Sequence, residues 1–317
     1  MKITCIIPST FSKKVTPSLR NCLDSLNRAK GFMELRIFVV SSNPWPVLIK
    51  RNGVRLLRIN FYSFSQVNND AIERTLKYPS DYYLFINDDA WLENDFFQKL
   101  LKEVKIKPDI LVPLIKSAKG EIIDSFGIEY FTSGYAKNSN FLTTKTELAP
   151  AACLLVKTSF LTKMKKGYRF YFNEILDSYL EDVEFSIRAR GLGAKINKTE
   201  NLIAYHMGSV SFGKKSRYVM FQTYRNIIWV ILMTWPLKAI LKNIISIIIV
   251  QGWVMFYGTV SYGPALYLKV ITSTFLNLSK LLSLRKNIIS AYGNSFKFQS
   301  VLSKYTFRTY HGKTIKI

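Results

Sequence analysis

Two adjacent carboxylates, Asp88 and Asp89, follow the apolar run 82–86 and precede an amphipathic pattern that begins at Phe96. The run is too short for a helix, so we expect a strand whose carboxyl end carries Asn87 and both carboxylates. In open α/β sheets, ligands bind beyond the carboxyl ends of the strands. Mg2+ typically takes one or two protein carboxylates and leaves its other positions to phosphate and water. The pair is therefore a candidate for holding a divalent cation and a nucleotide; a polar turn that caps the next helix is the alternative.

A second carboxylate pair, Glu181 and Asp182, lies near the start of segment 180–191, after an aromatic stretch. The segment has acids in its first turn, arginines in its last turn and Gly191 as a cap, which is typical of a helix. One of the two acids could act as a general base that takes a proton from an acceptor hydroxyl. Acids that only complement the helix dipole are the commoner explanation of such a pair.

Two further groups could contribute to such a site. His206, one of two histidines in the chain, follows an apolar strand pattern and could bind a phosphate or complete a metal shell; a structural role is the alternative. The segment 64–71 lies near the start of a predicted helix, and its amides could hold a nucleotide. Surface N-capping explains that segment almost as well.

The elements that must position these groups alternate between strand and helix over the first hundred residues. The predicted strands are 2–8, 35–40, 55–60 and 82–86. Helical patterns include 19–26 and 67–76. This alternation predicts right-handed βαβ units and a mostly parallel sheet. Later in the chain we expect strands at 110–113 and 151–156, and a hairpin or active-site loop at 122–135.

Length and cysteine content set outer limits on the protein class. A chain of 317 residues can form one large domain with an appendage, or two smaller domains. The three cysteines, at positions 5, 22 and 153, have no metal-ligand spacing and indicate no disulfide framework, so a reducing compartment fits best. The N-terminal segment is too briefly apolar for a signal peptide and is stopped by Pro8, so it is predicted to be the first strand.

The net charge of +24 is concentrated toward the C-terminus. After Glu200 the sequence has no Asp or Glu, whereas residues 201–317 include fifteen Lys or Arg. So basic a segment must meet an anionic partner, which is either phospholipid headgroups or nucleic acid.

The same part of the chain has two long uncharged stretches, 226–237 and 243–268. The second is longer than the roughly 20 residues that a membrane-spanning helix needs. However, it is interrupted by Gln251, by glycines at 252, 258 and 263, and by a proline at 264. A helix in the membrane interface or a re-entrant pair therefore competes with a true span. A buried helical hairpin of a soluble protein is the third interpretation.

The order and spacing of these motifs resemble those of family 2 glycosyltransferases of the GT-A type, especially the rhamnosyltransferase-like branch. The similarity runs from about residue 3 to residue 226. The motifs that carry it are Ile6-Ile7-Pro8, 64–71 with Asn69, Phe85-Ile86-Asn87-Asp88-Asp89, Pro150-Ala151-Ala152, Phe172-Asn173-Glu174, 180–185 with Arg188, Tyr205-His206 and Tyr224-Arg225-Asn226.

The resemblance implies roles for several of the matched residues. Asp89 and His206 would hold Mg2+ or Mn2+, and Asp88 would touch the donor sugar or ribose. Asp182, with Glu181 as the second choice, would be the catalytic base of an inverting reaction. The predicted donor-binding residues are Pro8, Ser9, Ser41, Asn69, Asn87 and Asp88.

Two positions depart from the family pattern. Where the family usually has an aspartate that reads the nucleobase, this chain has Ser41-Ser42-Asn43. The metal motif begins with Asn87 rather than aspartate, which leaves fewer carboxylates for a cation. The departures leave the identity of the base and the strictness of metal dependence open.

The sequence therefore predicts an α/β fold of the GT-A type, with a Rossmann-like, mostly parallel sheet flanked by helices over residues 1–225. A basic region with apolar helices, residues 226–317, is predicted to associate with a membrane. The predicted activity is transfer of a sugar from a UDP- or dTDP-sugar to a lipid-linked or membrane-borne saccharide. We expect it at the cytoplasmic face of the cell membrane, without nucleic acid.

Three alternatives stay open. A nucleotidyltransferase can place a similar metal motif on a similar sheet, but it has no need for the pair Glu181 and Asp182. A degenerate glycosyltransferase would bind the donor without turnover, which Asn87 and Ser41 keep open. A nucleic-acid-binding protein would use the basic segment and bind RNA or DNA with steep salt dependence, but no RNA-binding motif is present.

Overall fold

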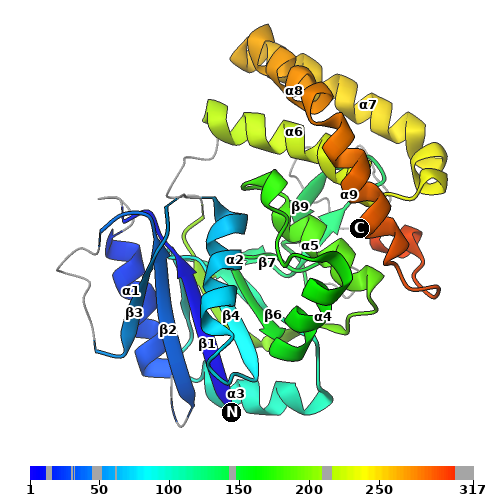
Figure 1. Ribbon diagram of the computed structural model, residues 1–317. Helices are drawn as coiled ribbons and strands as arrows, with labels where there is room; N and C mark the ends of the chain where they lie inside the picture. The colour runs from blue at the N-terminus through cyan, green and yellow to red at the C-terminus, as the bar shows by residue number, and fades with distance from the viewer. Residues whose placement is uncertain are drawn as a thin grey trace.

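The computed structural model describes residues 1–11, 16–29, 31, 33–44, 52–60, 63–142, 148–208 and 216–303. Within these ranges, a nine-stranded mixed sheet has the order β3-β2-β1-β4-β10-β6-β11-β5, and β7 pairs with β6. Helices cover both faces of this sheet (Figure 1). The strands are β1 (Lys2–Pro8), β2 (Glu34–Ser41), β3 (Val54–Arg58), β4 (Tyr82–Ile86), β5 (Ala90–Leu92), β6 (Ile110–Ser117), β7 (Ile123–Ser125), β10 (Cys153–Lys157) and β11 (Ile196–His206). A separate two-stranded sheet pairs β8 (Ile128–Tyr130) with β9 (Ala136–Asn138).

The first half of the sheet is parallel, as the alternating pattern predicts. Strand β1 pairs in parallel with β2 and β4, and β2 pairs in parallel with β3. All five residues of β4 are buried, because both faces of the strand are covered. The predicted strand that carries the first carboxylate pair is therefore confirmed.

The second half of the sheet is mixed. Strand β10 runs antiparallel between β4 and β6, while β11 is parallel to β6 and carries the antiparallel edge strand β5. The prediction of a mostly parallel sheet is thus correct for β3-β2-β1-β4. Beyond β4, parallel and antiparallel strand pairs are mixed. The short strand β5 was not predicted, because its three residues carry too little pattern to be recognised.

Two hydrophobic clusters fill the two faces of the sheet. One cluster contains residues of α1 (Thr16–Ala29) and α3 (Phe96–Glu103), which is followed by a 3-10 turn, η2 (Val104–Ile106). The other contains residues of α2 (Phe64–Thr75), α4 (Thr158–Tyr168), α5 (Glu181–Gly191) and α6 (Arg217–Thr234). Helices therefore sandwich the sheet, as expected for this fold class.

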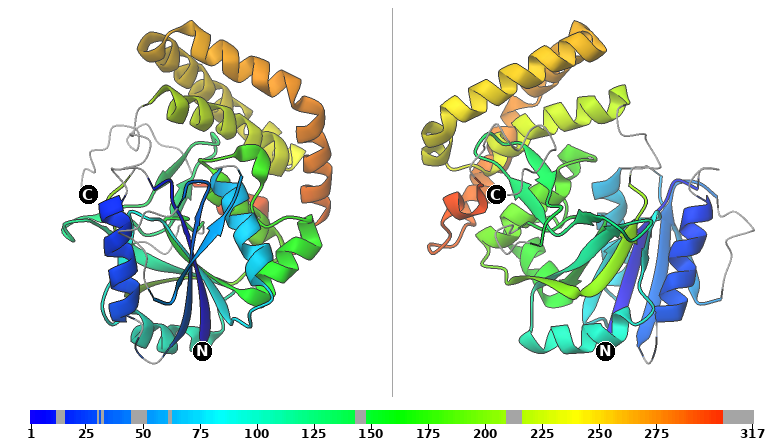
Figure 2. Two further views of the ribbon diagram at one scale, coloured as in Figure 1. Left: turned by 60° about the vertical axis from the view of Figure 1, so that its left-hand side comes forward. Right: turned by 180° about the vertical axis from the view of Figure 1, so that it is seen from behind.

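The C-terminal helices form a layer at one end of the molecule. Helices α6, α7 (Leu237–Tyr262) and α8 (Pro264–Leu276) lie together above the sheet, and α9 (Leu278–Ser290) returns along its side in all three ribbon views (Figures 1 and 2). Ile227, Trp229 and Val230 of α6 belong to the same buried cluster as the sheet residues. The predicted boundary between residues 225 and 226 therefore falls inside α6, and the division into two regions stays a prediction.

Among the described residues, α7 is the one helix that is long and apolar enough to cross a membrane, judged by length and composition alone. The uncharged stretch 243–268 is not a single helix. It breaks at Gly263, whose φ of +83° suits glycine, and Pro264 begins α8.

Candidate active site

The turn after β4 carries the first carboxylate pair to the carboxyl end of the parallel strands. The Asn87 amide donates to the Ala152 carbonyl (3.0 Å), and the Ala90 amide donates to the Asn87 carbonyl (3.1 Å). These bonds fold the turn tightly between β10 and β5. Asp88 and Asp89 are consequently buried, with 5% and 4% of their surface exposed.

Asp88 has an environment that disfavours its charged form. Burial raises its pKa to about 7, although a hydrogen bond with the Ser9 side chain lowers it, and the neighbouring Asp89 charge raises it. Its Oδ2 atom is buried and has no hydrogen-bond partner among the described residues. This oxygen is therefore available to accept a hydrogen bond from water or to bind a ligand.

His206, at the end of β11, lies between two carboxylates. Its Nε2 atom is 3.2 Å from Asp89 Oδ1, and its Nδ1 atom is 2.9 Å from Asp124 Oδ2. Burial by itself lowers the pKa of His206, but hydrogen bonds and charges from Asp124 and Asp89 outweigh it and raise the pKa to about 9. Asp124 was not identified from the sequence, because only the pairing of β7 with β6 brings it beside β11.

The second carboxylate pair lies at the start of α5, as predicted. Asp182 Oδ1 accepts a hydrogen bond from the Val183 amide (2.8 Å), and Oδ2 accepts one from the Ala151 amide (3.3 Å). Burial nevertheless raises the pKa of Asp182 above its usual range. Burial, together with the charge of Asp182, raises the pKa of Glu181 further. Glu181 Oε2 is buried and has no hydrogen-bond partner in the part of the chain that the structure describes.

The loop before α5 is held in an unusual backbone conformation. Asp177, Tyr179 and Leu180 have positive φ values of 65°, 69° and 61°. The Asn226 side-chain amide of α6 donates to the carbonyls of Leu176 (2.8 Å), Ser178 (2.9 Å) and Tyr179 (2.7 Å). Helix α6 therefore fixes the loop that leads into the second carboxylate pair.

One cavity of about 410 Å3 brings the two carboxylate pairs together. Seven of the predicted site residues line it: Pro8, Asn87, Asp88, Asp89, Glu181, Asp182 and His206. The sequence did not predict the contributions of β9, through Lys137 and Asn138, or of α6, through Thr223. These residues come from elements that are distant in sequence, and no local motif marks them.

Three predicted donor-binding residues do not line this cavity. Ser9 is fully buried behind it and bonds to Asp88. Ser41 is also fully buried, and its hydroxyl accepts a hydrogen bond from the Asn43 amide (3.1 Å).

Asn69 is the third of these residues, and its side chain is used within the protein. Its amide nitrogen donates to the Phe172 carbonyl and to Glu174 Oε1, both at 2.9 Å, and its Oδ1 accepts from the Phe172 amide (2.8 Å). Asn69 lines a separate hollow of about 590 Å3 beside α2, α4 and α9. In this structure Asn69 thus joins α2 to the 172–174 segment rather than facing the carboxylate cavity.

The donor atoms at the first carboxylate pair fit a divalent cation. Asp89 supplies a carboxylate and His206 an imidazole nitrogen, a combination that Mn2+ accepts. Among the described residues, no group of three or more His, Cys, Asp or Glu is arranged to hold a metal. A cation held by Asp89 and His206 would need its other ligands from phosphate and water.

Comparison with known proteins identifies the fold but does not identify a family. No family model and no curated protein matches this sequence. Among solved structures, GalNAc-T7 with UDP, GalNAc and Mn2+ aligns with a TM-score of 0.55 at 12% identity, over 75% of this chain and 48% of that one. This chain thus spans about half the length of that protein.

Two further structures align over most of both chains. Residues 1–349 of TarS from S. aureus align with a TM-score of 0.51 at 17% identity, over 95% of this chain and 83% of that one. The mannosyltransferase PcManGT from Pyrobaculum calidifontis, in complex with GDP-Man and Mn2+, aligns with a TM-score of 0.51 at 10% identity, over 91% and 85%.

The mixed sheet, its helical layers and these neighbours define the class: the chain has the GT-A fold, as the sequence predicts. In this chain the C-terminal helices α6–α9 pack onto the sheet domain, and α6 contributes Thr223 to the cavity.

Proposed function

We propose that this protein is an inverting, divalent-metal-assisted glycosyltransferase, related in its motifs to the rhamnosyltransferase-like branch of family 2. It would move a sugar from a nucleotide-sugar donor to a hydroxyl group of a lipid-linked or membrane-borne saccharide. The observation that carries the proposal is that one cavity of about 410 Å3 is lined both by the carboxylate–histidine group and by the pair Glu181 and Asp182.

In this proposal, Asp182 is the general base. It takes the proton from the acceptor hydroxyl, whose oxygen bonds to the anomeric carbon from the face opposite the leaving group. The bond between that carbon and the diphosphate oxygen breaks, and the nucleoside diphosphate leaves with the electron pair. A carboxylate whose pKa is raised by burial is a stronger base than an exposed one, which suits Asp182 for this role.

The carboxylate–histidine side would bind the donor. Asp89 and His206 are the proposed ligands of Mg2+ or Mn2+, and Asp88 and Asn87 the proposed contacts of the donor sugar. A bound cation would offset the negative charge that develops on the leaving diphosphate. Solved structures of the GT-A neighbours with UDP, with GDP-Man and with Mn2+ support a nucleotide-sugar donor and a divalent metal.

The acceptor is proposed to be presented at a membrane, at the cytoplasmic face. Support comes from the apolar helix α7 and from the absence of acidic residues after Glu200. Binding of the enzyme at a membrane raises the effective concentration of a lipid-linked acceptor without new contacts in the cavity.

The test is donor turnover by detergent-solubilised protein against a panel of nucleotide sugars, including UDP- and dTDP-sugars, with and without Mn2+. We expect one donor to release nucleoside diphosphate in a metal-dependent manner. Asp89→Ala and Asp182→Asn should each lower the rate about 100-fold or more. Asp95→Asn, which removes a partly exposed carboxylate that pairs with Lys99 outside the cavity, is the control and should retain full activity.

Two results would contradict the proposal. Release of pyrophosphate from a nucleoside triphosphate would identify a nucleotidyltransferase instead. Nucleotide binding without turnover of any donor, in the presence of lipid-linked saccharide acceptors, would identify a protein that binds the donor without catalysis.

A further inference from the structure

Helix α7 has one face packed on the protein and an opposite apolar face that is exposed. The buried residues Ala239, Asn243, Val250, Val254 and Gly258 recur at helical spacing along the whole helix. The opposite side carries large apolar residues with more than half of their surface exposed, including Leu241, Ile245, Ile248, Ile249, Phe256 and Val260. Helix α8 extends this surface with Leu268, Ile271 and Phe275. We call these exposed apolar residues of α7 and α8 the hairpin face.

Exposed basic residues lie on the same two helices as the hairpin face. Lys238, Lys242 and Lys269 are exposed on α7 and α8. The sequence contains no acidic residue after position 200 that could balance them locally. An apolar strip with cations on the same helices matches the chemistry of a bilayer surface that contains anionic lipid.

The first turns of α7 are tied to the sheet domain. The Thr132 and Ser246 hydroxyls lie 3.2 Å apart, and the Asn243 side-chain amide lies 3.5 Å from Gln299 Oε1. Thr132 belongs to the turn between β8 and β9, whose second strand lines the cavity. The start of α7 therefore cannot leave this domain without breaking these contacts.

The other end of α7 is tied to α6. Arg217, the first residue of α6, donates a hydrogen bond to the Tyr262 carbonyl (2.6 Å). A Cβ atom at Gly258 would lie only 2.9 Å from Tyr224 Cε2, so this position needs glycine for the two helices to approach closely. Figures 1 and 2 show α7 and α8 in an outer layer, with α6 between them and the sheet.

These contacts conflict with a helix that crosses a bilayer. A helix of 26 residues is about 39 Å long, and a span would place its two ends on opposite sides of a hydrocarbon core of about 30 Å. The start of α7 contacts the sheet domain, and its end contacts α6, which packs on that domain, so a span would draw Arg217 and the adjoining domain toward the hydrocarbon. Burying that domain in lipid would leave its polar groups without partners.

We propose that α7 and α8 lie in the plane of an anionic bilayer surface, with the hairpin face in the lipid, and that α7 does not cross the membrane. The inference rests on the proposed membrane association and is independent of the proposed reaction. Thr223 of α6 lines the cavity and α6 packs directly under α8, so this orientation keeps the cavity close to the lipid surface.

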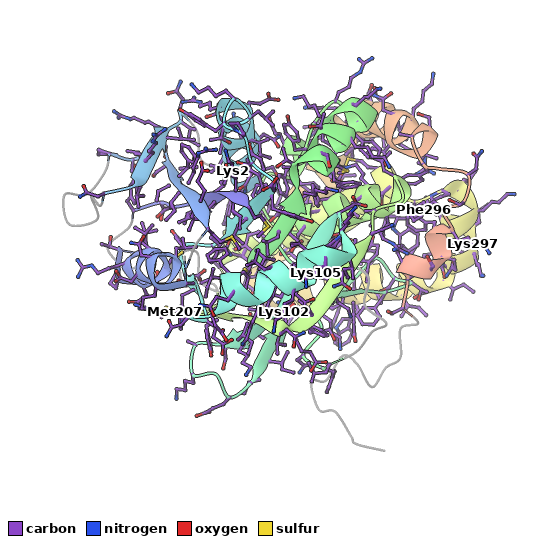
Figure 3. All side chains as sticks on the ribbon, turned by 90° about the horizontal axis from the view of Figure 1, so that it is seen from below. Lys2, Lys102, Lys105, Met207, Phe296 and Lys297 are labelled. Atoms are coloured by element: carbon purple, nitrogen blue, oxygen red, sulfur yellow. The ribbon has the colours of Figure 1, made fainter. Side chains whose placement is uncertain are left out.

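The first experiment measures binding of the full chain to phosphatidylcholine vesicles with and without phosphatidylglycerol. We expect binding to require the anionic lipid and to weaken as salt is raised. Ile245→Asp combined with Ile249→Asp should weaken binding about tenfold or more. The matched control is Ile106→Asp combined with Ile122→Asp, which alters two other exposed isoleucines. Ile106 follows Lys105, which lies on the side of the molecule away from the hairpin (Figure 3).

The second experiment distinguishes an in-plane helix from a span. Leu241→Cys and Phe256→Cys would each be labelled with an environment-sensitive fluorophore; the native cysteines 5, 22 and 153 are fully buried. The two positions lie on the same side of α7 and about 22 Å apart along its axis. Quenchers placed at known depths in the lipid should report the same shallow depth for both labels.

Two outcomes would overturn the inference. Depths that differ by about 22 Å would show that α7 spans the bilayer. If the wild-type chain binds neither kind of vesicle, a bilayer is excluded as the partner of the hairpin face. The same conclusion holds if the hairpin face instead joins two copies of the chain in solution. Donor turnover in detergent, measured on the same preparations, reports separately on the proposed reaction.

Discussion

Burial gives the two carboxylate pairs different chemistry at the scale of single residues. Asp182 keeps two backbone hydrogen-bond donors, whereas Glu181 Oε2 has no partner among the described residues. Burial raises the pKa of both groups, and that of Glu181 is raised further above its ordinary value. Two acids in one site with different pKa values can take different roles, as general base and as neutral neighbour.

The raised pKa of Glu181 predicts a pH-dependent stability. The folded-state pKa of Glu181 lies above its unfolded value of 4.5. Its contribution to stability is therefore complete below about pH 4.5 and is lost as the pH rises from there to the folded-state pKa. Glu181→Gln stays neutral and should escape that loss. The Tm of the variant minus the Tm of the wild type should therefore increase between about pH 4 and about pH 8.

The control is Glu200→Gln, which replaces an exposed glutamate of β11. Its Tm difference from the wild type should stay nearly constant with pH. A Glu181→Gln difference that is equally flat would show that Glu181 is not protonated preferentially in the folded state.

Asp124 should act on a bound metal through His206. By accepting the proton of Nδ1, the Asp124 carboxylate orients the ring so that Nε2, which lies 3.2 Å from Asp89 Oδ1, can bind a metal when it gives up its proton. Asp124→Asn should weaken Mn2+ binding about 10- to 100-fold, measured as free Mn2+ by electron paramagnetic resonance. Glu121→Gln removes the same charge from an exposed neighbouring position and should leave the affinity unchanged. Equal Mn2+ affinity in wild type and Asp124→Asn would exclude this role.

At the scale of elements, α6 joins the C-terminal helices to the active-site loop. Asn226 satisfies three carbonyls of a loop with three non-glycine residues at positive φ, a conformation that costs about 1–3 kcal/mol per residue. Gln222 adds a hydrogen bond to Asp177 Oδ2 (2.7 Å). Helix α6 therefore stabilises the backbone on which Glu181 and Asp182 depend.

Removal of the Asn226 amide should loosen this loop. Asn226→Ala removes this donor from the carbonyls of Ser178 and Tyr179, whereas the Leu176 carbonyl keeps Arg225 Nη2 (3.1 Å), so we expect a loss of about 2 kcal/mol in unfolding free energy. Chemical denaturation measures this change. Asn277→Ala is the control, because the Asn277 side chain donates to the Ser273 carbonyl one helical turn earlier (2.8 Å) rather than to the active-site loop. Equal losses in the two variants would exclude a special role for Asn226.

At the scale of the whole molecule, the hydrophobic core continues past residue 225, where the sequence becomes basic and apolar. Ile227, Val230 and Trp235 lie in the same cluster as sheet residues, together with Leu281 and Ile288 of α9. The Trp235 indole also donates to the Tyr130 hydroxyl (2.8 Å). The C-terminal helices are thus part of the hydrophobic core as well as a surface layer.

A chain shortened to residues 1–225 should therefore fail to fold cooperatively. It would lose the core residues of α6 and α9 and expose their partners on the sheet domain. Thermal unfolding followed by circular dichroism in detergent, with the full chain as reference, measures the effect without confusing it with low solubility. A sharp transition of the short chain would mean that 1–225 is an independent domain.

The sequence by itself determined the local features. Short apolar runs bounded by polar turns predicted β1, β4 and β10, because strand formation depends on neighbouring residues. The carboxylate pairs and His206 were predicted to share one site, because strand ends and a helix start carry them. The resemblance to family 2 glycosyltransferases added the expected roles, which stay predictions.

Only the tertiary structure decided which distant residues meet. Asp124, Lys137 and Thr223 reach the site through sheet pairing and helix packing, and no local pattern marks such contacts. Asn69 lies in the predicted helix, but its partners Phe172 and Glu174 are about a hundred positions away. The same reason applies to α7: its composition allowed a span or an interfacial helix, and its contacts with Thr132 and Arg217 favour the second. Long-range contacts depend on how whole elements pack, and this information is not local to any segment.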